Sequence, residues 1–123
     1  WRGQPDKLSK VYLRLSQLQS GQKQSAEALK SINTLINMAN DSSVVTDSDL
    51  VSAYQLKADL SLKSNKEDDA IESYRTLLDK FEEKFPLYSS RYNLGKIYFD
   101  QGNLKEAEKV WSPLSDRAEA QLW

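Results

Sequence analysis

Residues able to do acid–base, metal or nucleophilic chemistry are few in this sequence and poorly placed for it. Adjacent carboxylates occur at Asp68-Asp69 and at Glu82-Glu83. Neighbouring residues of a helix point in different directions, so neither pair can converge on one proton or one ion. The chain contains no cysteine and no histidine. This excludes thiolate nucleophiles, Ser-His-Asp triads and metal sites built on those two residues.

Phosphate and calcium sites are not predicted either. The glycines are far apart, and none belongs to the Gly-Lys-Ser/Thr signature of a phosphate-binding loop. Asp41, Asp47 and Asp49 lack the central glycine and the glutamate of a calcium-binding loop. We therefore expect no enzymatic activity, no bound metal and no cofactor.

Composition and charge narrow the choice of partner. The 123 residues carry a net charge of −1, and their lysines and arginines are spread along the chain without the basic stripe that nucleic-acid binding requires. We expect no nucleic-acid partner. No apolar run approaches the roughly 20 residues that a membrane-spanning helix needs. The chain begins with Trp1, which we interpret as the start of a segment of a longer protein.

The spacing of apolar residues predicts an all-α protein. Apolar residues recur three and four positions apart, and short polar turns separate these stretches. In the first helix the predicted apolar face consists of Leu8, Val11, Tyr12, Leu15 and Leu18. We expect helices over about 7–20, 24–39, 47–63 and 67–84, and two more within 88–114.

Several residues predict where these helices begin and end. Thr46 or Asp47 is suited to the N-cap of the third helix. Phe85-Pro86 should end the fourth, because the residue before proline is disfavoured in helical geometry. Pro113 should end or bend the sixth, with a further helix starting at Arg117. Val44 and Val45 are expected to pack back onto the second helix.

The stretch from Tyr88 to Leu114 contains a helix-packing pattern. Gly95 follows a leucine, Tyr98 stands three residues after it, and Ala107 precedes Trp111 by four. Gly95 and Ala107 are small enough for two helices to cross closely, and the aromatic residues fill the space around the crossing. This order resembles the tetratricopeptide repeat, whose signature is Leu-Gly-x-x-Tyr, a later alanine and then phenylalanine. Arg91, at the tryptophan position of the family, departs from that signature.

Three alanines mark three copies of this pattern. Ala28, Ala70 and Ala107 are 42 and 37 residues apart, where the family repeat is about 34 residues long. In the second copy, Tyr54 and Ala58 take the tryptophan and glycine positions. The first copy is not expected to align without a shift, because Tyr12 would occupy the small-residue position. Each alanine is followed by a bulky residue four positions on (Ile32, Tyr74, Trp111) and by a leucine three beyond it (Leu35, Leu77, Leu114).

The resemblance implies an all-α fold: a right-handed α-solenoid of about three antiparallel helix hairpins and the start of a further helix. We expect one tetratricopeptide-like domain over residues 1–123. Its repeats should lie at about 7–39, 47–85 and 87–116, followed by a truncated helix at 117–123.

The resemblance also implies a non-catalytic protein–protein interaction scaffold. In the family, the first helices of the repeats line a concave groove that binds a peptide or a helix of a partner protein. A carboxylate clamp is not expected, because Gln55 and Asp59 replace its basic residues. The competing interpretation is that Tyr88 and Tyr92 pack on the linker or on a neighbouring repeat. The predicted groove residues are Ser52, Gln55, Asp59, Tyr88, Tyr92, Asn93, Lys96 and Phe99.

The alternative function is a structural spacer or oligomerisation segment of a larger envelope assembly protein, associating through the ends that carry Trp1 and Trp123. The end of the fourth helix, Tyr-Arg-x-Leu-Leu-Asp-Lys-Phe-x-x-Lys-Phe-Pro, is similar to bacterial cell-envelope members of the family. This implies the periplasm or the cell envelope, with the cytoplasm as the alternative.

Overall fold

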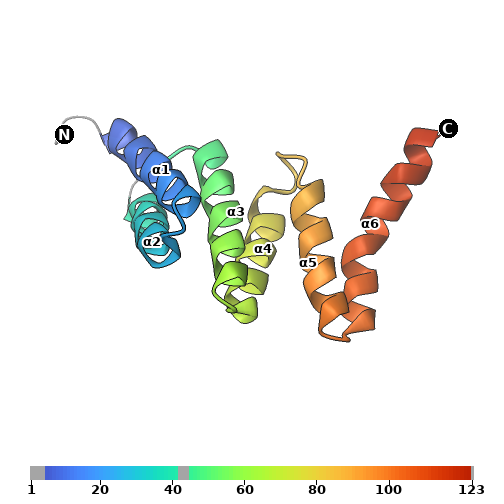
Figure 1. The fold of residues 1–123 in the computed structure, drawn as a ribbon. Helices are drawn as coiled ribbons and strands as arrows, with labels where there is room; N and C mark the ends of the chain where they lie inside the picture. Colours follow the sequence, from blue (N-terminus) through green and yellow to red (C-terminus); the bar gives the residue numbers. More distant parts are fainter. Residues whose placement is uncertain (1–4, 42–44, 123) are drawn as a thin grey trace. The chain divides into compact units, whose positions relative to one another are not determined.

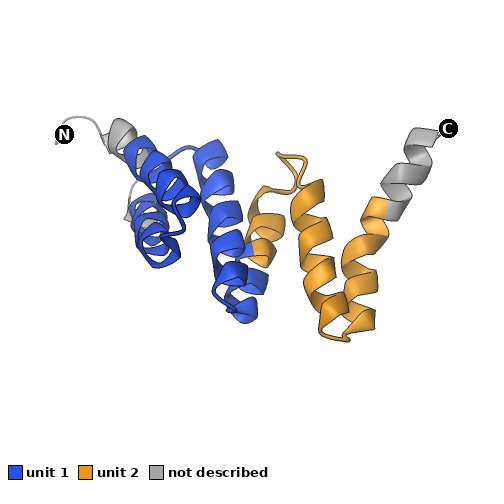
Figure 2. Ribbon diagram, in the orientation of Figure 1, with its two compact units in different colours: residues 1–73 blue, residues 74–123 orange. Residues whose placement is uncertain are grey.

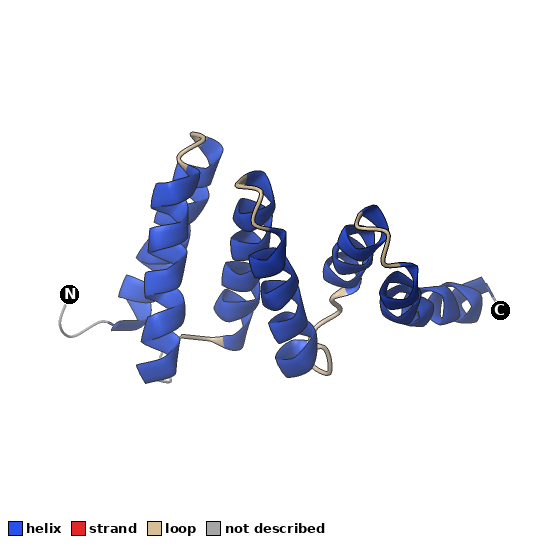
Figure 3. Ribbon diagram, turned by 90° about the horizontal axis from the view of Figure 1, so that it is seen from below, coloured by secondary structure: helices blue, strands red, loops and turns tan. Residues whose placement is uncertain are grey.

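The computed structural model describes residues 5–41 and 45–122, and the side chains of residues 10–39 and 45–114. In these residues it contains helices joined by short turns and no strand (Figures 1 and 3). The predicted all-α class is confirmed. The helices are α1 (Pro5–Gly21), α2 (Ser25–Asp41), α3 (Asp47–Lys63), α4 (Glu67–Phe81), α5 (Tyr88–Asp100) and α6 (Leu104–Leu122).

The chain divides into two compact units, which Figure 2 distinguishes by colour. Unit 1 is Trp1–Ser73 and unit 2 is Tyr74–Trp123, so the boundary falls within α4. The predicted single domain over residues 1–123 stays a prediction, as does the right-handed twist of the solenoid.

The turn inside each helix pair has the same backbone conformation in all three pairs. Lys23, Asn65 and Gly102 adopt left-handed geometry, with φ of 63°, 60° and 80°. The N–H of the following residue then donates to a carbonyl five residues earlier, which is the Schellman arrangement that closes a helix C-terminus. These bonds join Gln24 to Gln19 at 2.8 Å, Lys66 to Ser61 at 2.7 Å and Asn103 to Tyr98 at 2.9 Å.

Buried small residues also stand at the same distances from this turn in all three helix pairs. Seven residues before each left-handed residue stands a small, buried one: Ser16, Ala58 or Gly95. Five residues after it stands the buried alanine of the second helix. The first repeat therefore aligns with the other two without a shift, and the prediction that Tyr12 occupies its small-residue position is wrong. The Ser16 hydroxyl donates to the Leu13 carbonyl at 2.7 Å, which allows a polar residue to fill this buried position.

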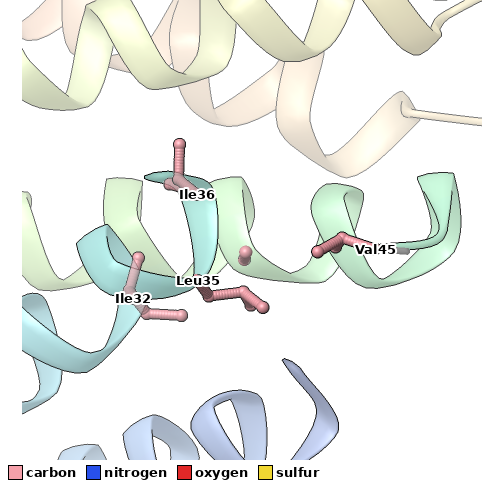
Figure 4. Close-up of a cluster of buried hydrophobic side chains, with 5 residues drawn as sticks. Ile32, Leu35, Ile36 and Val45 are labelled. Atoms are coloured by element: carbon pink, nitrogen blue, oxygen red, sulfur yellow. The ribbon is translucent and has the colours of Figure 1, made fainter. Parts of the chain in front are cut away.

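The core of unit 1 forms where α2 meets α3 (Figure 4). Val45 is buried in it, which confirms that this residue packs back onto α2, whereas Val44 lies outside the described residues. The buried cluster consists of Ile32, Leu35, Ile36, Val45 and Ala53, and Tyr12 and Leu13 of α1 pack against it.

Helix α1 forms as predicted, but its core face is only partly the predicted one. Tyr12 packs on the core as predicted, together with Leu13, while Val11, Leu15 and Leu18 are exposed. The Leu8 side chain lies outside the described residues. Polar groups occupy part of the buried side, and one of their contacts joins α1 to α2, where the Ser31 hydroxyl donates to Gln19 Oε1 at 2.9 Å. Apolar periodicity therefore placed Tyr12 correctly and the three exposed residues wrongly.

The boundaries of α3 and α4 have local causes. Thr46 caps α3 as predicted, since its side-chain oxygen accepts a hydrogen bond from the Asp49 N–H at 3.2 Å. Helix α4 ends at Phe81, before the predicted end at residue 84. The N–H groups of Lys84 and Phe85 both donate to the Phe81 carbonyl, at 3.1 and 3.0 Å. The chain thus turns before it reaches Pro86.

Helix α6 continues through Pro113 to Leu122. The predicted end of the helix at Pro113 and the separate helix from Arg117 are therefore wrong, while the alternative, a bend at Pro113, stays a prediction. Proline removes one N–H from a helical turn. The N–H absent at position 113 would have donated to the Lys109 carbonyl. The next carbonyl, that of Val110, accepts a hydrogen bond from Arg91 Nη1 at 3.1 Å, which ties this turn of α6 to α5.

Candidate functional site

The α5–α6 hairpin of unit 2 is built around Gly95. The indole of Trp111 lies so close to this glycine that an added Cβ would overlap three atoms of the ring. Ala107, the other small residue of the crossing, is buried as predicted. Gly95 and Ala107 therefore allow the close crossing that the packing pattern predicted, and Trp111 fills the space beside it.

Trp111 supports two exposed aromatic side chains of α5. Its ring is stacked on Tyr92 with the centroids 5.9 Å apart, and it packs at a tilt on Phe99 at 5.8 Å. The Trp111 Nε1 also donates to the Tyr92 carbonyl at 3.0 Å. Tyr92 and Phe99 are each 53% exposed. Rings that are held on one side and open to solvent on the other are typical of protein-binding surfaces.

An open hollow of about 430 Å³ adjoins this surface. Its most exposed apolar residue is Leu104, at the start of α6, and Glu108 lies one turn further along. The lining residues are Phe99, Leu104, Ala107, Glu108, Trp111 and Ser112, and we call this feature the α5–α6 hollow. Of these residues, only Phe99 was predicted to belong to a binding surface. Leu104, Glu108 and Trp111 nevertheless have the spacing of residues on one face of a helix.

A polar cluster connects α4 to this hairpin. Arg75 donates from Nε and Nη2 to the hydroxyl of Tyr98, the Nε distance being 2.8 Å. The guanidinium also lies over the Tyr98 ring, 5.5 Å from its centroid, and Nη2 is 3.8 Å from Glu106 Oε2. The hydrogen bond to Tyr98 raises the pKa of Arg75, with Glu106 and Asp79 adding to the effect and burial opposing it. The cluster therefore stabilises a charged arginine and holds Tyr98 in place.

Arg91 has a structural role, although it departs from the family signature. Its Nε and Nη2 donate to the two carboxylate oxygens of Glu82 at 2.9 and 2.6 Å. Its Nη1 binds the Val110 carbonyl. Arginine thus takes the position of the family tryptophan and joins three segments by hydrogen bonds. Glu82, one of the adjacent carboxylates Glu82-Glu83, is therefore the ion-pair partner of Arg91.

The predicted groove residues fall in both units. In unit 2, Tyr88, Tyr92, Lys96 and Phe99 are exposed on α5, while the Asn93 amide donates to the Tyr74 hydroxyl at 3.3 Å. In unit 1, Gln55 and Asp59 precede the left-handed residue Asn65 by the same numbers of residues as Tyr92 and Lys96 precede Gly102 in unit 2. Ser52, the remaining predicted groove residue on α3, is partly buried.

The described side chains form no recognisable catalytic or metal-binding arrangement. Asp68 and Asp69 are exposed in the first turn of α4, where their negative charges interact favourably with the helix dipole. No group of three or more acidic side chains in the described part of the chain is placed to hold a metal ion. In the same residues, no helix combines the length and the apolar character needed to cross a membrane.

A family model described as the tetratricopeptide repeat matches residues 51–79 and 88–110. These stretches contain α3 with most of α4, and α5 with the first part of α6. The match does not include α1 and α2, which nevertheless share the turn and the packing register of the matched repeats. No curated protein and no solved structure matches the chain significantly. Repeats of this family generally mediate protein–protein interaction. The chain thus contains tetratricopeptide repeats over residues 51–79 and 88–110, within an all-α helical repeat.

Proposed function

We propose that the protein is a non-catalytic interaction module that binds a peptide or a helix of a partner protein, with α5 as the main contact element. The observation that carries the proposal is the exposure of Tyr92 and Phe99 on a fixed support. Trp111 packs against one side of each ring and leaves the other accessible. Such side chains lose little conformational entropy on binding, so their contacts contribute efficiently to affinity.

Polar residues beside these rings give the surface its selectivity. Lys96 is exposed and lies on the same side of α5 as Tyr92 and Phe99, four and three residues away. It favours a partner segment with a carboxylate next to an apolar residue. Asn93 is oriented by the Tyr74 hydroxyl and offers its carbonyl oxygen to a backbone N–H of the partner. Tyr88 extends the aromatic surface by one turn.

Helix α3 supplies a second proposed contact surface. Gln55 and Asp59 stand in the register of Tyr92 and Lys96, and Ser52 precedes Gln55 by one turn. In family members the first helices of the repeats bind the partner, which supports the assignment of these three residues. Asp59 stands where α5 has the positive charge of Lys96, so α3 favours a cationic partner segment.

The proposal is tested by crosslinked affinity capture followed by direct binding. A protein that the wild-type chain captures is identified, and its overlapping peptides are titrated against the purified chain by fluorescence anisotropy. Tyr92→Ala with Lys96→Glu should weaken peptide binding at least about tenfold, because it removes an aromatic anchor and reverses a charge. Circular dichroism checks that both forms are equally helical.

The matched control is Lys105→Glu, which makes the same charge change at an exposed position of α6. It should leave peptide binding unchanged. Equal affinity of wild type and the Tyr92/Lys96 variant, or an equal loss in the control, would contradict the assignment of the site to α5.

A structural role, in which copies of the chain associate, is the second candidate function. It is supported by the exposed Val11, Leu15 and Leu18 of α1, which peptide binding on α5 does not use. Exposed apolar rows of this kind are typical of protein contacts.

A further inference from the structure

An apolar stripe runs along the exposed side of α1. Val11, Leu15 and Leu18 are 45%, 39% and 60% exposed, and their spacing of four and three residues places them on one side of the helix. The opposite side of α1 contacts the core of unit 1 through Tyr12 and Leu13. We call these three exposed residues the α1 stripe.

Positive charge borders the α1 stripe. Lys10 and Arg14, one turn apart, line the same surface as the three apolar residues. Lys10 Nζ is 3.6 Å from an oxygen of Asp49, but its side chain remains 63% exposed. Asp49 is only 15% exposed, but the contact is long and Lys10 itself is open to solvent, so the lysine can also reach a second carboxylate. The stripe is therefore an apolar row with cations along one flank.

The α5–α6 hollow has the complementary properties. Phe99, Leu104 and Trp111 give it an apolar lining from two helices, and Glu108 adds a carboxylate on the α6 side. A row of side chains from one helix packs well between two others. The nearby cations Lys96 and Lys105 do not line the hollow. A helix with an apolar row and a cationic flank toward α6 fits this lining in both shape and charge.

We infer that the α1 stripe of one copy of this chain docks in the α5–α6 hollow of a second copy, with Lys10 and Arg14 directed toward Glu108. The inference rests on the second candidate function, self-association, and does not depend on peptide binding at α5. The two surfaces differ, so the contact is heterologous: a pair of copies keeps one unused α1 stripe on one copy and one unused α5–α6 hollow on the other. Association therefore proceeds head to tail.

The test uses one substitution on each surface, chosen so that its helix tolerates the change. Leu18→Lys places a cation in the last turn of α1, and Leu104→Asp places an anion in the first turn of α6; both suit the helix dipole. Each introduces a charge into an apolar contact and should weaken association at least about tenfold. Because small interfaces bind weakly, sedimentation equilibrium is measured up to about 1 mM.

The expected result has three parts. The average mass of the wild-type chain rises with concentration. Each variant alone remains a monomer. An equimolar mixture of the Leu18→Lys and Leu104→Asp variants forms a one-to-one dimer and no larger species, because one variant keeps the stripe and the other keeps the hollow. Leu18→Lys lies on α1, away from the peptide-binding residues Tyr92, Lys96 and Phe99, so peptide binding at α5 should persist in this variant.

A wild-type chain that is monomeric at all concentrations would overturn both self-association and the head-to-tail contact. Self-association that either variant retains, or variants that do not complement each other, would overturn the head-to-tail contact alone. A second pair guards against misfolding: Arg14→Glu and Glu108→Lys change exposed side chains only. Each alone should weaken association, and the two together in one chain should restore it. Failure of that rescue would overturn the assigned orientation of the charges.

Discussion

The indole ring of Trp111 covers the α-carbon of Gly95. A Cβ at position 95 would overlap Nε1, Cδ1 and Cε2 of the ring. The same Nε1 donates to the Tyr92 carbonyl, one turn before the glycine on α5. The absence of a side chain at position 95 thus permits the close approach of α5 and α6 and also the hydrogen bond that holds Trp111 beneath the exposed aromatic residues.

We predict that Gly95→Ala destabilises the chain by about 1–3 kcal/mol, the usual cost of overpacking a well-filled site. The methyl group would force the indole away from α5 and break its bond to Tyr92. Urea denaturation followed by circular dichroism measures the loss. Gly21→Ala is the control, because a Cβ there would meet nothing within 4 Å. A Gly95→Ala variant as stable as this control would contradict the role assigned to the glycine.

Pro113→Ala should stabilise the chain, because it returns an N–H to the middle of α6 without removing a buried side chain. Proline in a helix interior costs about 3 kcal/mol relative to alanine. Because α6 continues through the proline, we expect less than this full cost to be recovered, a gain of about 1–2 kcal/mol in the free energy of unfolding. Thermal and urea denaturation provide the measurement. An unchanged or lower stability would mean that the turn is adapted to the proline.

Arg91→Lys should lower the free energy of unfolding by about 1–2 kcal/mol, since lysine cannot bind Glu82 with two donors and the Val110 carbonyl with a third. The loss should be the same in a Pro113→Ala background, because the restored N–H donates to the Lys109 carbonyl and leaves the Val110 carbonyl to Arg91. A double-mutant cycle tests this additivity. Strong coupling between the two substitutions would contradict the separate roles of the two carbonyls.

The left-handed turns predict opposite effects at two positions. Lys23→Gly should stabilise the chain by up to about 1 kcal/mol, because glycine adopts positive φ without the steric cost that lysine bears. Gly102→Ala should destabilise it by about 1 kcal/mol. A Cβ at position 102 would meet no atom within 4 Å, so this effect is conformational and not a clash. Urea midpoints of the two variants should move in opposite directions from the wild type.

Tyr54 should make the stability of unit 1 sensitive to alkaline pH. Burial raises the pKa of Tyr54 above its ordinary value of 10.0, and the nearby Glu72 carboxylate adds to the effect. The folded state thus favours the neutral phenol more than the unfolded state does. This contribution is complete below pH 10.0 and declines as the pH rises toward the higher pKa of the folded chain.

The measurement compares urea midpoints of the wild-type chain and Tyr54→Phe at about pH 9 and about pH 10.5, on either side of the ordinary tyrosine pKa. The wild type should lose more stability over this interval than the variant. Glu72→Gln removes the second cause of the shift and should reduce the loss without abolishing it. Equal pH dependence in all three proteins would contradict the effect.

Local sequence chemistry predicted most of the helices and the second and third repeats. Ala70 and Ala107 are small in the middle of amphipathic patterns, and Thr46 is a strong capping residue, so each acts through its own neighbourhood and was assigned correctly. The first repeat was not aligned, because Ser16 stands in its small-residue position and Lys23 in its left-handed one. Neither residue type signals those conformations, and both became recognisable through the shared turn geometry.

The sequence by itself determined the all-α fold class and the resemblance to the tetratricopeptide repeat, because both follow from residue types at short, fixed spacings. Tertiary structure decided which sides of the helices are buried. Leu15 is exposed and Ser16 is buried in adjacent positions of α1, and Arg91 is bound where the family has tryptophan. Helical periodicity gives the relative directions of side chains, but only packing partners distant in sequence, such as Trp111 for Tyr92, determine which of those directions faces another helix and which faces solvent.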